Sequence, residues 1–118
     1  MNSKNLLEHL TNEQLSSVEF VQDYLQLHFE DKTLTCYIWP YIRSNEQEYR
    51  NGDPEYKDQL CNLIANRVLH LAFIENVTLT ITFSNTSEIV LSLDSSNTDI
   101  VGEIAILSDN ENNWSIFE

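Results

Sequence analysis

The chain has 118 residues, of which 42% are apolar and 10% aromatic, and its 19 acidic against six basic side chains give a formal net charge of −13. This composition holds enough large apolar side chains for a core, so it excludes an acidic disordered tail and predicts a single folded domain, residues 1–118. The charge excludes nucleic acid and anionic membranes as partners and favours a cationic protein.

The acidic side chains are unevenly distributed. Residues 68–118 contain no lysine or arginine, while eight acidic residues lie there: Glu75, Glu88, Asp94, Asp99, Glu103, Asp109, Glu111 and Glu118. No stretch approaches the roughly 20 apolar residues of a membrane span. Glu8 and His9 interrupt any signal-peptide core near the N-terminus, so we expect a cytoplasmic protein.

A short helix is predicted at the N-terminus, where Leu6, Leu7 and Leu10 share one face and Ser3 is a candidate cap. Residues 11–14 have the pattern of a capping box that opens a further turn. Residues 15–38 then alternate between apolar and polar side chains, which is typical of strands with one buried face. Polar pairs and triplets at 22–23 and 30–32 divide this segment into a three-stranded antiparallel meander.

A polar linker, residues 40–52, is predicted to follow. A second helix begins near Asp53, a good N-cap, and Pro54, which suits the first helical position. Its apolar residues recur at spacings of three and four up to Val68. Residues 68–93 alternate again and predict a second meander, and two apolar runs within residues 103–118 predict a closing hairpin.

The two meanders align with each other at an offset that drifts from 53 to 55 residues. The matched apolar residues are Val18 and Phe20 with Leu71 and Phe73; Leu25, Leu27 and Phe29 with Leu79, Ile81 and Phe83; and Leu34, Cys36 and Ile38 with Ile89, Leu91 and Leu93. We therefore predict an internal repeat, about 3–39 and about 53–93. The predicted class is α+β: a duplicated helix plus meander, with the helices packed on a mostly antiparallel sheet. The alternative is that the similarity does not reflect a duplication, because any two meanders that follow amphipathic helices look this similar in sequence.

No catalytic, cofactor or metal site is predicted. The three histidines and two cysteines lack zinc-ligand spacing, and residues 94–99 lack the glycine and glutamate of a calcium loop. No nucleophile motif or phosphate-binding loop is present, so we do not expect an enzyme. Cys36 and Cys61 are predicted to be small buried side chains rather than a disulfide.

A partner-binding surface is predicted from the outward face of the first meander, which carries Tyr24, His28, Tyr37 and Trp39. Another part of this chain, a partner or a second copy could cover these side chains, and tyrosine and tryptophan are typical interface anchors. Nearby carboxylates would attract a basic partner. The candidate carboxylates are Asp94, Asp99, Glu103, Asp109 and Glu111.

Residues 18–29, 34–40 and 56–60 and the terminal Trp114 resemble a group of small uncharacterised bacterial proteins, which implies no activity. In size, charge and lack of motifs the chain is also similar to acidic immunity proteins that neutralise basic toxin nucleases. That class-level similarity implies a non-enzymatic protein that binds a cationic toxin domain. The alternative is a self-associating protein that forms a homodimer through the aromatic side chains of the first meander.

Overall fold

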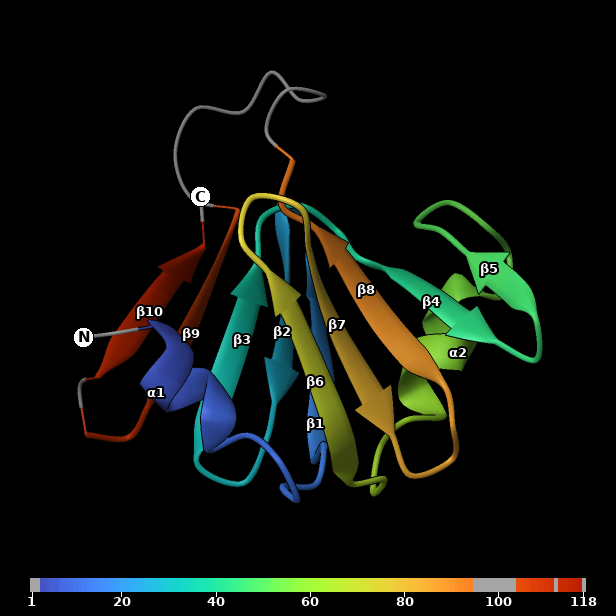
Figure 1. Ribbon diagram of the computed structural model, residues 1–118. Helices are drawn as coiled ribbons and strands as arrows, with labels where there is room; N and C mark the ends of the chain where they lie inside the picture. The colour runs from blue at the N-terminus through green and yellow to red at the C-terminus, as the bar shows by residue number, and fades with distance from the viewer. Residues whose placement is uncertain (1–2, 95–103, 112, 118) are drawn as a thin grey trace.

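In a computed structural model, which describes residues 3–94, 104–111 and 113–117, the chain forms two five-stranded antiparallel sheets around one core (Figure 1). Sheet 1 has the strand order β1 (Ser17–Val21), β2 (Tyr24–His28), β3 (Lys32–Cys36), β9 (Ala105–Asp109) and β10 (Trp114–Phe117). Sheet 2 has the order β5 (Gln47–Tyr49), β4 (Tyr41–Ser44), β8 (Glu88–Ser92), β7 (Thr78–Phe83) and β6 (Val68–Ile74). Two short helices complete the described fold, α1 (Ser3–Glu8) and α2 (Tyr56–Cys61).

The predicted α+β class was wrong, because the protein is mostly β. Each helix has only six residues, too few to cover a sheet, and the two sheets bury their apolar faces in a shared core instead. Residues 62–65, predicted as helix, form turns, and Arg67 already belongs to a β-bridge. The Asp53 carboxylate does not cap α2; it accepts a hydrogen bond from the backbone N–H of Arg50 at 2.7 Å, and Glu55 occupies the N-cap position.

Both meanders form at the predicted positions, and the strands of one pair in the same register as the corresponding strands of the other. Cross-strand partners in sheet 1 match those in sheet 2: Leu25–Cys36 corresponds to Leu79–Leu91, and Leu27–Leu34 to Ile81–Ile89. These are the same matches that align the two segments in sequence.

The correspondence extends to the segments before each meander. Gln14 forms an isolated antiparallel bridge with Arg67, and these two residues are themselves 53 positions apart. Asn12 and Ala65, also 53 apart, both have left-handed backbones, with φ of 76° and 77°. The capping box predicted at residues 11–14 does not open a helix; the segment instead pairs with residues around Val68.

Each meander is followed by a hairpin that joins the opposite sheet. The β4–β5 hairpin pairs with β8, and the β9–β10 hairpin pairs with β3. The 40–52 segment is therefore not the predicted linker. Its turn is formed by Asn45 and Glu46, with φ of 53° and 66°, which suits a tight hairpin.

The helices lie at the two open sides of the sheet pair (Figure 1). α1 contacts β9 and β10 and faces β6, while α2 contacts β1 and β4. Leu7 and Leu10 near α1 and Leu60 and Leu63 near α2 are all buried, again 53 positions apart. Cys36 is buried as predicted, whereas Cys61 is exposed on α2 because it lies on the helix side away from Leu60; both cysteines are free.

Candidate partner-binding surfaces

The outer side of sheet 1 carries a cluster of aromatic and branched apolar side chains. Strand alternation directs them away from the core, and the register brings Ile106 opposite Ile116. Trp114 is 53% exposed, Tyr37 39% and Ile116 37%, and the rings of Tyr24 and Tyr37 lie 5.9 Å apart. We call these five residues, Tyr24, Tyr37, Ile106, Trp114 and Ile116, the aromatic face.

Polar and acidic groups lie beside the aromatic face. His28 Nε2 is 3.1 Å from a carboxylate oxygen of Glu19, and its Nδ1 is 3.1 Å from the Thr33 hydroxyl. Glu111 is exposed at the tip of the β9–β10 hairpin. Asp109 instead closes that turn, because its carboxylate accepts backbone hydrogen bonds from Asn113 and Glu111, which lower its pKa.

The structure places the predicted site residues differently from one another. Tyr24, His28 and Tyr37 lie on the outer side of sheet 1, as predicted. Trp39 does not: it stacks on Phe20 and lies 6.4 Å from the Tyr56 ring, because the chain crosses from sheet 1 to sheet 2 after Cys36 and the alternation ends. Asp94 is half-buried just beyond β8. Asp99 and Glu103 lie outside the described residues.

Three residues of the aromatic face were missed by the sequence analysis: Ile106, Trp114 and Ile116. The signal for them is the alternation within the closing hairpin. Their position beside the first meander depends on β9 pairing with β3, a contact between segments about 70 residues apart in the chain, which local periodicity does not reveal.

The outer side of sheet 2 has a different chemistry. Its strands present threonines at 78, 80 and 82, and the Tyr41 ring is flanked by Arg43 and Arg50 at 5.8 and 4.4 Å. Arg43 pairs with Glu88 at 2.8 Å, and Arg50 pairs with Glu48 at 3.0 Å. The hydrogen bond to Glu88 raises the pKa of Arg43. Apart from Ile74, which lies opposite Thr78 and is 56% exposed, the described side chains of this side are mainly polar, and Arg43 and Arg50 are paired.

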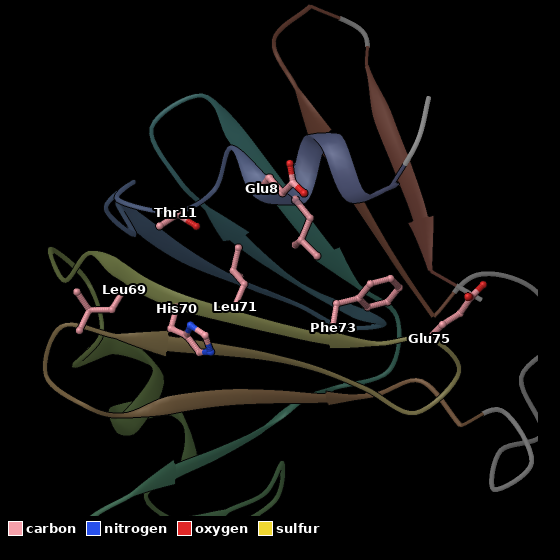
Figure 2. Close-up of a pocket in the computed structure, with 8 residues that line it drawn as sticks. Glu8, Thr11, Leu69, His70, Leu71, Phe73 and Glu75 are labelled. Carbon is pink, nitrogen blue, oxygen red and sulfur yellow. The ribbon is translucent and has the colours of Figure 1, made fainter.

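A groove of about 600 Å³ lies between α1 and β6 (Figure 2). Its walls are mainly apolar, with one exposed carboxylate from Glu8 on the helix and another from Glu75 just after the strand. Leu71 and Phe73 point toward the helix side in Figure 2, and Leu69 extends sideways at the start of the strand. The lining residues are Leu7, Glu8, Thr11, Leu69, His70, Leu71, Phe73 and Glu75.

One buried charged cluster lies near the turn before β3. Lys32 donates hydrogen bonds to Glu13 and, at 2.8 Å, to Asp31, and its side chain is only 5% exposed. Burial acts to lower the pKa of Lys32, but the two carboxylates outweigh it and the net pKa is raised. Burial raises the pKa of Glu13, while the hydrogen bond from Lys32 lowers that of Asp31. Lys32 thus ties Glu13 to the turn at Asp31, while the second carboxylate oxygen of Glu13, Oε1, is buried without a hydrogen-bond partner.

Reactive and metal-binding groups are sparse in the described structure. Burial raises the pKa of the Cys36 thiol to about 12, so it stays protonated and unreactive. Burial likewise raises the pKa of the Tyr56 phenol, which donates a hydrogen bond to the carbonyl of Pro40 at 2.5 Å. Residues 3–94, 104–111 and 113–117 contain no group of three or more metal-ligating side chains.

No protein-family model matches the chain, and neither a curated protein nor a solved structure matches it. None of the helices in the described ranges combines the length and hydrophobicity needed to cross a membrane.

Proposed function

We propose that this protein binds a basic protein through the aromatic face and neutralises it, in the manner of an immunity or inhibitor protein. One observation carries the proposal: the outer side of sheet 1 exposes Trp114, Ile116 and Tyr37 beside the half-buried Tyr24. The outer side of sheet 2 has matching strand pairs but presents mainly threonines and paired charges, with Ile74 as its exposed large apolar side chain. Exposed aromatic clusters of this kind are typical of interface centres.

Charge favours a cationic partner over a second copy of the chain. Each molecule has a formal net charge of −13, so two copies repel each other, and both Glu19 and Glu111 are exposed. Like charges across an interface oppose association, whereas opposite charges accelerate it. The side chains of sheet 1's outer side include no lysine or arginine in the described strands, since Lys32 points inward and is buried.

The basic partner would be neutralised because carboxylates and aromatic side chains both contact its basic surface. The carboxylates attract the basic surface at long range, and the aromatic side chains then exclude water from the contact. For a toxin that uses lysines and arginines to hold a phosphate backbone, an acidic protein docked there would block the substrate by occupying the same charges.

The test is an affinity capture from lysate of the native host, eluted with rising salt, using wild type beside two double variants. Trp114→Ser with Ile116→Thr alters the aromatic face, and Ile74→Thr with Val77→Thr removes a comparable exposed apolar area elsewhere. We expect wild type and the Ile74/Val77 control to retain the same basic protein, released as salt screens the attraction, and the face variant to lose it.

Two results would contradict the proposal. One is retention of the basic protein by the face variant at the wild-type level. The other is a salt-tolerant dimer of the protein alone, measured by light scattering and abolished by Trp114→Ser with Ile116→Thr, which would favour the self-associating alternative.

A further inference from the structure

The α1–β6 groove has a counterpart on the other open side of the molecule, and that counterpart is filled. There, between α2 and β1, Phe20 stacks on Trp39, Trp39 contacts Tyr56, and the Lys57 ammonium lies 5.6 Å from the Phe20 ring centre. Tyr56 is only 1% exposed. The chain's own aromatic side chains thus close this side, which we call the α2 opening.

At the groove the aromatic packing is less complete. Phe73 aligns with Phe20, and the two rings lie at matching positions of β6 and β1, opposite Leu79 and Leu25. On this side the buried Phe117 ring packs edge-on against Phe73, with the ring centres 5.5 Å apart, and it covers only part of the Phe73 ring. In keeping with this, Phe73 is 37% exposed, although it lies on the inward side of β6 opposite Leu79.

The groove also has a chemical preference. Glu8 and Glu75 contribute carboxylates and no lysine or arginine lines it. β6 is an edge strand that pairs only with β7 among the described strands, so an extended segment can lie along it. A groove of about 600 Å³ is within the usual range for a site that encloses one or two large side chains.

We propose that the groove accepts a tryptophan or similarly large apolar side chain from an extended segment of the partner, with arginine or lysine on both sides of it. The ring covers the part of Phe73 that Phe117 leaves exposed, and the flanking cations pair with Glu8 and Glu75. This inference rests on the proposed function insofar as the partner is a basic protein, but none of the residues that line the groove belongs to the aromatic face.

The experiment is an amide NMR titration of the full chain with the peptide acetyl-Arg-Trp-Arg-amide. We expect the largest shifts at Leu69, Leu71, Phe73 and Glu75. Leu69→Lys should weaken binding at least about tenfold, because it puts a cation into the apolar wall. Ile74→Lys adds the same charge on the same strand outside the groove, and it should weaken binding less than about twofold. Both side chains are more than half exposed, so both variants should fold.

Two further comparisons test the chemistry. Glu8→Gln with Glu75→Gln should weaken the peptide by about two- to fivefold at low salt, and acetyl-Arg-Ala-Arg-amide should bind at least about tenfold more weakly. The inference would be overturned if the alanine peptide bound equally well. It would also be overturned if the amide shifts spread over acidic residues and left the groove residues unchanged. Groove shifts that grow with protein concentration without peptide would overturn it too, because the occupant would be a second copy.

The outcomes separate the two proposals. Loss of the basic protein in the Trp114/Ile116 variant with no peptide binding in the groove leaves the proposed function intact and removes this inference. If the peptide binds in the groove and the Trp114/Ile116 variant still captures the basic protein, this inference stands and the proposed function is removed.

Discussion

The two open sides of this protein are built from matching elements, yet one is closed and the other is hollow. In the α2 opening, Trp39 stacks on Phe20 and also meets the buried Tyr56, whereas at the α1–β6 groove Phe73 meets only Phe117 among the described rings and stays 37% exposed. The outer sides of the two sheets differ in the same way, aromatic on one and threonine-rich on the other. The strand registers match from Ser17 and His70 onward, although β6 alone has a bulge between Val68 and His70. The differences lie mainly in the side chains. We therefore look for binding at the α1–β6 groove and on the aromatic face, where apolar side chains are left exposed.

The strongest test of this comparison is to remove an aromatic ring from the α2 opening. Tyr56→Ser should reduce the free energy of unfolding by about 3–5 kcal/mol, because it removes a buried ring and leaves a cavity. Phe73→Ser, at the matching side, should cost only about 1–2 kcal/mol, because that ring is already partly in water. Urea denaturation followed by circular dichroism measures both.

A control separates the ring from its hydroxyl. Tyr56→Phe keeps the ring and loses only the hydrogen bond to Pro40, so it should cost about 1 kcal/mol. Equal costs for Tyr56→Ser and Phe73→Ser would mean that the two sides are packed alike and would remove the basis of the comparison.

A second difference between the halves is the charged cluster. Lys32 aligns with Ser87, which is also buried and whose hydroxyl lies 2.9 Å from that of Ser44. Lys32→Met should destabilise the protein by about 2–3 kcal/mol at neutral pH, because it leaves the Glu13 carboxylate buried without its partner. Adding Glu13→Gln should recover part of that loss, since no buried charge is then left unpaired. A double-mutant cycle in urea measures both effects.

The pH dependence provides an independent check on Lys32→Met. Because burial raises the folded-state pKa of Glu13, protonation favours the folded state, and the variant should recover stability relative to wild type as the pH falls from neutral through that pKa. At the alkaline end, the raised pKa of Lys32 means that wild type keeps its ion pair below the ordinary value of 10.5 and loses it as the pH rises further. The difference in stability should therefore narrow in both directions. A difference independent of pH would show that packing, not charge, is lost.

The strands of the two meanders could be predicted from the sequence because their apolar residues alternate over long runs, as Leu25, Leu27 and Phe29 do. The fold class could not be predicted, because α2 ends after six residues although the helical spacing of apolar residues continues to Leu63 and Val68. The β4–β5 hairpin was missed because its strands have four and three residues and only Ile42 is fully buried.

The candidate site was predictable only in part, for a related reason. Tyr24 and Tyr37 follow from local alternation. Trp114 and Ile116 join them only because a distant hairpin pairs with β3, and Trp39 leaves them because the chain changes sheets. Each of these outcomes depends on which strands become neighbours, and a pattern read along the chain does not contain that information.

The smallest expected effect concerns the two matching turns before the meanders. Asn12 and Ala65 have nearly the same left-handed backbone, with φ of 76° and 77°. Alanine pays about 1–2 kcal/mol in that conformation, whereas asparagine tolerates it better. Ala65→Gly should therefore stabilise the protein by about 0.5–1 kcal/mol, the relief of strain exceeding the extra entropy of glycine in the unfolded chain. Asn12→Gly should change stability by less than about 0.5 kcal/mol. Thermal denaturation of both variants gives the comparison. A stabilisation that is equal in the two, or absent at Ala65, would show that the two turns are not strained in the way their backbones indicate.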